Sequence, residues 1–292
     1  MAELEYFVVD VFTDRALAGN PLAVVMNTAS LGSDQMLAIA REFNLSETTF
    51  IERRPMAIEQ AEGVRVRIFT IQEELAFAGH PTLGTASVLR RQAAETVVDE
   101  TVRLALNVGT IPVVFDGVLG TMTQRDPEFG EELDPAVVAD LIGLSEDDLD
   151  PALKPTIVST GTAFAIVVLR SPQALKRLAV RQSEASPWLR ERGGRWFYVL
   201  APVAADGIDF RARIQFYGGE DPATGSAAGC AISYLVKNGV VASGKQIHVR
   251  QGEEVGRPSD LYLSAKVKEA QITEVRVTGS TVYVANGRIF LP

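Results

Sequence analysis

The sequence predicts an α+β protein made of two related halves. Residues 79–86 and residues 220–227 both fit the pattern [His/Asp]-Pro-x-x-Gly-[Ser/Thr]-Ala, and an alternating run typical of a strand precedes each of them. An apolar stretch of small residues with helical spacing follows each motif. The many short strands and few helices elsewhere favour this class over a βαβ array. A chain that builds strand, turn and helix twice, with an ionisable group at each turn, indicates two halves that face one site.

Length and composition limit the class of protein. A chain of 292 residues, 47% hydrophobic and 22% charged, is long enough for two domains with full cores. Its longest apolar run, residues 163–169, is far shorter than the roughly 20 residues that span a membrane. The acidic first residues lack the pattern of an export signal, and a single cysteine fits a reducing cytoplasm. A net charge of −9 argues against nucleic acids and membranes as partners, so a small anionic substrate would need help from helix N-termini or arginines.

The first half, residues 1–117, is predicted to hold two helices. Ser33 is the expected N-cap of a helix at Ser33–Phe43, with Met36, Ile39, Ala40 and Phe43 as its buried stripe. The second helix is expected at residues 81–91. Strands are expected at residues 6–12, 21–26, 48–52, 64–69, 102–106 and 111–115.

The second half, residues 118–292, follows a shift in composition near Gly117 and a polar, turn-rich stretch at residues 125–135. Its last strand is expected either to stay in the second half or to return to the first. Helices are expected at residues 137–141 and 222–237. Strands are expected at residues 156–169 with a break at Gly161, at 196–200 and 211–216, and over most of 247–290.

Asp221 and His80 each precede a proline at the start of an expected helix. Aspartate is a preferred N-cap and proline is favoured at the first helical position, so Asp221 can be read as a structural cap. The small residues after Pro222 leave backbone amides open to hold a carboxylate, which favours a functional role. His80 is a poor capping residue that titrates near neutral pH, so either a catalytic role or an ordinary core position explains it.

Glu47 lies between Leu45 and Phe50 at an expected helix-to-strand junction. A solvated loop carboxylate is the commonest fate of a glutamate. Partial burial at this junction would instead raise its pKa into the range that is useful for general acid–base chemistry.

Other chemistries fit the sequence poorly. Two histidines and one cysteine give no basis for a zinc site. A hydrolase triad of Ser226, His80 and Asp221 can be written, but Ser226 lacks a nucleophile elbow. A racemase with two opposed thiols would need a cysteine at each turn, whereas Cys230 lies inside the second expected helix, where packing explains it.

Six segments in the same order resemble the PhzF-like isomerases of phenazine biosynthesis, which are relatives by fold of diaminopimelate epimerase. They cover essentially the whole chain: residues 9–13, 19–25, 44–48, 77–86, 220–227 and 251–259. The resemblance implies two similar domains, each a curved, mostly antiparallel sheet around a central helix, with the active site in the cleft between them. It also implies a homodimer that needs no cofactor.

The resemblance assigns roles to matching positions. Glu47, in Asn-Leu-Ser-Glu-Thr, is implied to be the essential acid/base, with His80 and Asp221 as further catalytic residues. Asn20 and Gly79 are implied to lie at the substrate, and the backbone amides of Gly225 and Ser226 are implied to bind its carboxylate. Two positions depart from the family pattern: Ile71 replaces a proline, and the loop before the second motif is the short Phe-Tyr-Gly-Gly at residues 216–219.

Both lines of reasoning predict a proton-transfer isomerase. Glu47 would move a proton on a small cyclic or amino carboxylate while helix N-termini stabilise the negative charge. The competing hypothesis is a non-catalytic protein that binds a small carboxylate. A desolvated glutamate favours the enzyme, because a binding site gains little from it.

Overall fold

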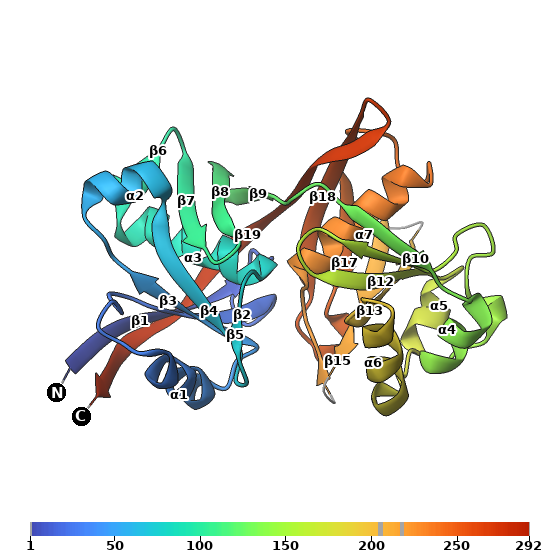
Figure 1. Ribbon diagram of the computed structural model, residues 1–292, viewed down its shortest axis with the longest axis horizontal. Coiled ribbons are helices and arrows are strands. Elements are labelled where there is room, and N and C mark those ends of the chain that lie inside the picture. The colour runs from blue at the N-terminus through green and yellow to red at the C-terminus, as the bar shows by residue number, and fades with distance from the viewer. Residues whose placement is uncertain (1, 204–206, 217–218, 292) are drawn as a thin grey trace. The chain divides into compact units, whose positions relative to one another are not determined.

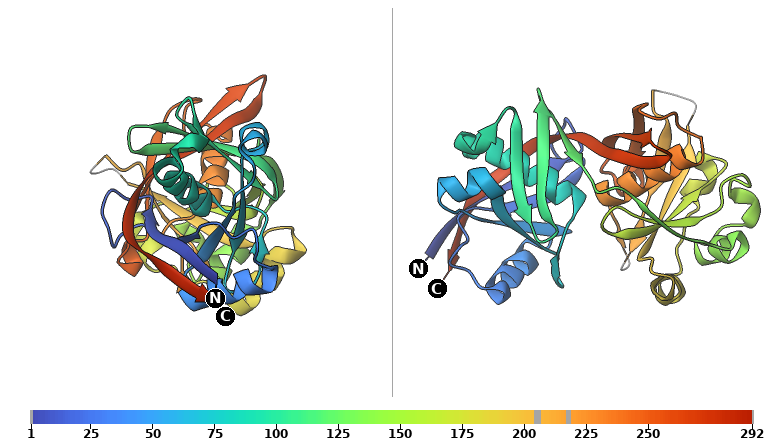
Figure 2. Two further views of the ribbon diagram at one scale, coloured as in Figure 1. Left: turned by 90° about the vertical axis from the view of Figure 1, so that its left-hand side faces the viewer. Right: turned by 45° about the horizontal axis from the view of Figure 1, so that its top comes forward.

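The computed structural model describes residues 2–203, 207–216 and 219–291. The chain forms two compact units, Met1–Thr123 with Thr278–Pro292, and Gln124–Val277 (Figure 1). The first segment ends at Thr123 instead of residue 117 because β9 (Leu119–Thr123) pairs antiparallel with β8 (Gly109–Asp116). The long strand β19 (Gln271–Leu291) brings the chain back to the first unit, where it runs antiparallel beside β1 (Ala2–Val11) (Figures 1 and 2).

In the first unit a sheet surrounds the helix α3 (Gly79–Gln92). This helix packs against strands on several sides: β1, β2 (Asn20–Val25), β3 (Glu47–Glu52), β7 (Thr101–Leu106), β8 and β9. Its first eight residues are all buried, and most of them have small side chains. A Cβ at Gly84 would lie 2.7 Å from Leu22 Cδ2, so this glycine permits close packing of α3 on β2.

The rest of the first unit completes the sheet and covers its faces. These elements are α1 (Ser33–Phe43), α2 (Met56–Glu62), β4 (Val64–Phe69), β5 (Glu74–Leu75), η1 (Ala94–Thr96) and β6 (Val97–Val98). Along β1, β2, β3, β4, β7 and β8 the successive pairings are antiparallel, parallel, antiparallel, parallel and antiparallel.

The second unit repeats this order of pairings. Along β11 (Thr156–Ser159), β12 (Ala163–Val168), β13 (Trp196–Pro202), β14 (Phe210–Arg213), β17 (Ile247–Gln251) and β18 (Ser259–Lys268) they are again antiparallel, parallel, antiparallel, parallel and antiparallel. The helix α7 (Gly225–Lys237) takes the place of α3: it connects β14 to β17, packs against β11, β12 and β18, and is buried from Gly225 to Val236.

The remaining elements of the second unit lie around this core. They are β10 (Glu128–Glu132), α4 (Pro135–Leu141), η2 (Glu146–Asp148), α5 (Pro172–Lys176), α6 (Gln182–Glu191), β15 (Gln215–Phe216), β16 (Gly219–Glu220) and η3 (Glu253–Val255). The predicted α+β class with two similar domains, each a mostly antiparallel sheet around a central helix, is therefore confirmed.

All four predicted helix starts differ from the structure; the helix expected at residues 137–141 begins at Pro135. Ser33 is the first residue of α1 and not its N-cap; the cap is Gly32, whose N–H donates to Gln35 Oε1, while the Ser33 hydroxyl accepts from Arg67. The helix expected from residue 81 begins at Gly79, and the one expected from Pro222 begins at Gly225. In the part of the chain that the structure describes, no helix combines the length and apolar character needed to cross a membrane.

Candidate active site

Three predicted site residues of the first unit lie together. Asn20 begins β2 and Glu47 begins β3, and because these strands are parallel, both residues lie at the same edge of the sheet. His80 lies in the first turn of α3. Asn20 Nδ2 is 3.1 Å from His80 Nδ1, and His80 Nε2 is 3.5 Å from Glu47 Oε2. The structure thus brings Asn20, His80 and Glu47 into one row, with Gly79 next to His80.

The charge state of His80 follows from its burial. Its side chain is 4% exposed, and desolvation lowers its pKa to about 3. The imidazole is therefore neutral at physiological pH. Since the Asn20 amide nitrogen is a donor, Nδ1 must accept, and the single ring proton lies on Nε2, facing Glu47. The contact joins a neutral donor to a carboxylate and is not an ion pair.

Glu47 remains accessible from outside. Its side chain is 16% exposed, compared with 4% for His80, and Asn20 is fully buried. At 3.5 Å the His80–Glu47 contact is long for a hydrogen bond, as is common at catalytic sites without substrate. The arrangement presents one partly exposed carboxylate, whose Oε2 is buried on the side of His80, backed by a polar chain that ends inside the protein.

The turn that precedes Asn20 is held by a residue to which the sequence assigned no role. Asp10 is buried at the end of β1, and its Oδ2 accepts a 2.6 Å hydrogen bond from the Leu17 amide. Gly19 has a φ of +65°, and a Cβ there would lie 2.4 Å from Val11 O, so the turn requires glycine.

Asp221 lies in the second unit, in the turn before α7, and it does not cap the helix. The N-cap is Thr224, whose side chain makes no cap hydrogen bond within the described residues. Instead, Thr224 Oγ1 donates to Asp221 Oδ2 at 2.6 Å. Asp221 is 6% exposed. The structural explanation of Asp221 as the N-cap of α7 is therefore wrong.

Gly225 and Ser226 form the first turn of α7, where backbone amides have no acceptor within the helix. The Gly225 carbonyl accepts from Gln124 Nε2 at 2.8 Å, which holds this turn from below. The hydrolase alternative finds no support, because the two ring nitrogens of His80 are already directed at Asn20 and Glu47. Residues 217 and 218, in the short loop that differs from the family pattern, lie outside the described residues.

Cys230 packs inside α7, as predicted. It is fully buried, its Sγ is 3.5 Å from Thr160 Oγ1, and burial raises its pKa to about 11. A thiol with this pKa is almost entirely protonated at neutral pH and is a poor nucleophile.

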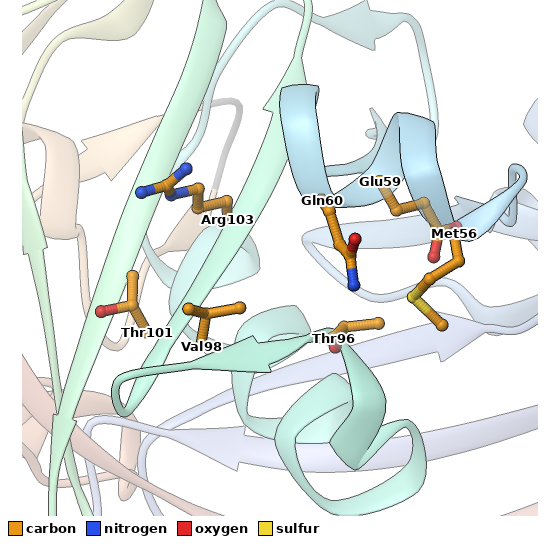
Figure 3. Close-up of a pocket in the computed structure, with 7 residues that line it drawn as sticks. All are labelled: Met56, Glu59, Gln60, Thr96, Val98, Thr101 and Arg103. Atoms are coloured by element: carbon orange, nitrogen blue, oxygen red, sulfur yellow. The ribbon is translucent and has the colours of Figure 1, made fainter.

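A separate hollow of about 230 Å³ lies on the first unit (Figure 3). Met56 and Gln60 of α2 point across it toward Thr96. The Glu59 carboxylate at its wall is satisfied by the Arg53 side chain and the Arg54 amide. Glu47 and His80 are not among its lining residues as the structure describes them, and the hollow has no group that suggests chemistry.

Relatives of known sequence and structure match the chain from end to end. The family model described as phenazine biosynthesis-like protein (PhzC-PhzF) matches residues 9–287. A trans-2,3-dihydro-3-hydroxyanthranilate isomerase from Pseudomonas aeruginosa is 35% identical over 98% of this chain and 99% of its own length. An isomerase of the same name from Pseudomonas chlororaphis is 33% identical, again over 98% of this chain and 99% of its own.

Solved structures agree with the fold. A phenazine biosynthesis protein of the PhzF family from Bacillus anthracis superposes with a TM-score of 0.87 at 23% identity, over all of both chains. A predicted epimerase from Pseudomonas aeruginosa gives a TM-score of 0.83 at 31% identity, over 99% of this chain and all of its own. A hydroxyproline epimerase from Agrobacterium vitis shares the fold at a TM-score of 0.64 and 11% identity, over 98% of this chain and 92% of its own. The two units share one topology, and the family model and the relatives match nearly the whole chain. The chain therefore belongs to the phenazine biosynthesis-like protein family and is an isomerase.

Proposed function

We propose that this isomerase moves a proton between carbon atoms of a small cyclic or amino carboxylate, with Glu47 as the acid/base and without a cofactor. The carboxylate takes the proton from a carbon made acidic by conjugation, becomes a carboxylic acid, and returns the proton to another carbon. The observation that carries the proposal is the partly exposed Glu47 carboxylate backed by the neutral His80.

His80 supports Glu47 and does not replace it as the base. An imidazole whose pKa is about 3 has little tendency to take a proton at neutral pH. Its Nε2–H instead points at the carboxylate that does the chemistry. In this role His80 holds Glu47 in one orientation throughout the proton transfer.

The amides of Gly225 and Ser226 are proposed to bind the substrate carboxylate. The positive end of a helix favours an anion, and the first turn of α7 offers N–H groups that the Thr224 side chain leaves uncovered in the described structure. Asp221 is proposed to act on the same substrate, orienting a polar group or passing the proton on. A homodimer and a cytoplasmic location stay predictions; light scattering of the purified protein tests the dimer.

The first test uses trans-2,3-dihydro-3-hydroxyanthranilate, on which the named relatives act, together with a panel of small unsaturated and α-amino carboxylates. In deuterated water an isomerase of this kind incorporates deuterium at carbon, whereas a binding protein does not. Glu47→Gln keeps the shape of the side chain but cannot cycle a proton, so turnover is expected to fall by about 10²–10⁴.

Ligand affinity in Glu47→Gln should survive, because the carboxylate is assigned to α7. The matched control is Glu52→Gln, the same change at the other end of β3, where the carboxylate lies 3.8 Å from Arg65 and Arg67. Turnover in this control should stay within about two-fold, as expected for a residue outside the reacting site. Full activity in Glu47→Gln would remove Glu47 from the mechanism.

A further inference from the structure

The side chain of Gln251, the last residue of β17, is 1% exposed and uses its whole hydrogen-bonding capacity. Its Oε1 accepts from Tyr198 Oη at 3.1 Å and from the Thr224 amide at 3.2 Å. Its Nε2 donates to the Asp221 carbonyl at 2.8 Å and to Thr224 Oγ1 at 3.1 Å. An amide side chain has two donor and two acceptor positions, so all four are filled.

The partners fix which way each proton points. Burial, with Asp221 and Cys230 nearby, raises the pKa of Tyr198, so its hydroxyl stays protonated and donates. The Asp221 carbonyl can only accept, so Gln251 must turn its nitrogen toward the turn. Thr224 Oγ1 therefore receives a proton from Gln251 and gives its own single proton to Asp221 Oδ2, 2.6 Å away.

We propose that Gln251 is a positioning residue that fixes the Asp221 carboxylate through Thr224. This inference rests on the proposed role of Asp221 in the reaction. Gln251 holds both the backbone of the turn, at the Asp221 carbonyl and the Thr224 amide, and the direction of the Thr224 hydroxyl. The carboxylate that would meet substrate is thereby set before substrate arrives.

The backbone beside Gln251 leaves the side chain little freedom to move. Gly252 has a φ of +83°, and a Cβ there would lie 2.6 Å from Pro222 O and 2.4 Å from Arg257 O. The end of β17 therefore packs directly on the turn that carries Asp221. A substitution at Gln251 therefore acts directly on this turn.

The first experiment needs no substrate. Gln251→Ala removes the acceptor of the Thr224 amide, so hydrogen exchange at this amide, measured by NMR, should become at least about ten-fold faster, since local opening then exposes it. Ser233→Ala is the matched control: it removes a buried hydrogen bond of 2.7 Å to Gly229 O in α7 and should leave Thr224 exchange unchanged. Unchanged exchange in Gln251→Ala would overturn the proposal. If this variant fails to fold, Gln251→Glu and the Thr224 variants decide it.

The second experiment measures turnover of trans-2,3-dihydro-3-hydroxyanthranilate. Gln251→Glu keeps the shape but replaces the donor at Thr224 Oγ1 with an acceptor, which draws the hydroxyl proton away from Asp221. We expect kcat to fall about 10- to 100-fold, the usual effect of a misplaced group, with KM within about three-fold. Thr224→Val should lower kcat in the same way. Thr224→Ser, which keeps the hydroxyl, should have a kcat close to that of the unchanged protein.

Two further variants separate this proposal from the role of Asp221. If Gln251 acts through Asp221, adding Gln251→Glu to Asp221→Asn should lower kcat no further than Asp221→Asn alone. Full turnover in Asp221→Asn would refute the role of Asp221 itself. Low turnover in Asp221→Asn with full turnover in Gln251→Glu and Thr224→Val would refute only the positioning role.

Discussion

His80 shows how the environment of one residue sets its chemistry. Histidine is usually considered first as a proton carrier near neutral pH. Here burial keeps the ring neutral, and Asn20 fixes the proton on Nε2. The sequence predicted that His80 and Glu47 share one site, but not the 3.5 Å between their side chains, because that distance depends on how α3 packs against β3. Gln251 and Thr224 lay within recognised motifs, yet nothing in their spacing revealed the hydrogen bonds between them.

The neutral state of His80 should appear in the pH dependence of stability. The unfolded chain takes up a proton at this residue near the ordinary histidine pKa of 6.5, whereas the folded protein resists until about pH 3. The stability that this difference in pKa contributes is fully present above the unfolded pKa of 6.5 and is lost as the pH falls toward the folded pKa of about 3. His80→Gln should therefore lose less stability on acidification, by up to roughly 1.4 kcal/mol for each pH unit in this window. Urea unfolding of both proteins from about pH 7 to about pH 4 measures the difference; parallel curves would mean that the pKa of His80 is the same in the folded and the unfolded protein.

At the scale of elements, strong periodic signals were predictive and helix starts were not. Of the predicted stripe of α1, Met36, Ile39 and Ala40 are buried and Phe43 is only partly buried. The strand region at residues 156–169 breaks around Gly161, as predicted. The motif Asp221-Pro222 suggested a helix start at Pro222, but the hydrogen bonds of Gln251 hold this turn out of the helix. The helices α2, α5 and α6 were not predicted; α2 and α5 are short, and α6 contains Pro187.

The close packing of α7 against Gln124 gives a prediction for this helix. A Cβ at Gly229 would lie 1.9 Å from Gln124 Oε1, and Gln124 is held by Gly225 O and Thr160 Oγ1. Moving Gln124 breaks both hydrogen bonds, so Gly229→Ala should lower the free energy of unfolding by about 1–3 kcal/mol. This loss outweighs the roughly 1 kcal/mol by which alanine stabilises a helix relative to glycine. The measurement is the urea midpoint. Gly219→Ala, where the added Cβ would meet only Phe216 O at 3.8 Å, is the control.

The same substitution in a Gln124→Ala background tests the cause. Without the Gln124 side chain, Gly229→Ala should become neutral or stabilising by up to about 1 kcal/mol, because only helix propensity remains. An equal cost in both backgrounds would mean that another contact opposes the methyl group.

Over the whole molecule, the repeated topology carries different chemistry in its two copies. The parallel pair β2–β3 begins with Leu22 opposite Glu47, and its counterpart β12–β13 begins with Phe164 opposite Trp196. The second unit thus has the indole of Trp196 where the first has Glu47, the proposed acid/base. At the motif before the central helix, His80 is matched by Asp221. The repeat has kept the scaffold, while the proposed proton-transfer group is present in one copy of the parallel pair, which suits the proposed reaction in which one carboxylate both removes and returns the proton.

The chain path makes the two units unequal as folding units. The second is one continuous segment, Gln124–Val277, with its own core. The first needs Thr278–Pro292, whose strand β19 pairs with β1 from Ala2 to Val11. A chain of residues 1–123 alone would leave that side of β1 unpaired, and an exposed edge of this length promotes aggregation.

We therefore expect residues 124–277, expressed alone, to unfold cooperatively, and residues 1–123 to be poorly folded or aggregated. Joining residue 123 to residues 278–291 should restore cooperative unfolding to the first unit. A linker of roughly four to six Gly and Ser residues spans the gap, at about 5–6 Å per square root of its length, because Thr121 Oγ1 and Thr278 Oγ1 are only 2.8 Å apart. Thermal melts followed by circular dichroism, with NMR amide dispersion, distinguish the three proteins. As a control, the same linker followed by residues 278–291 in scrambled order should not rescue the fragment. Cooperative folding of residues 1–123 without β19 would show that the returning strand is an accessory to the first unit and not part of its core.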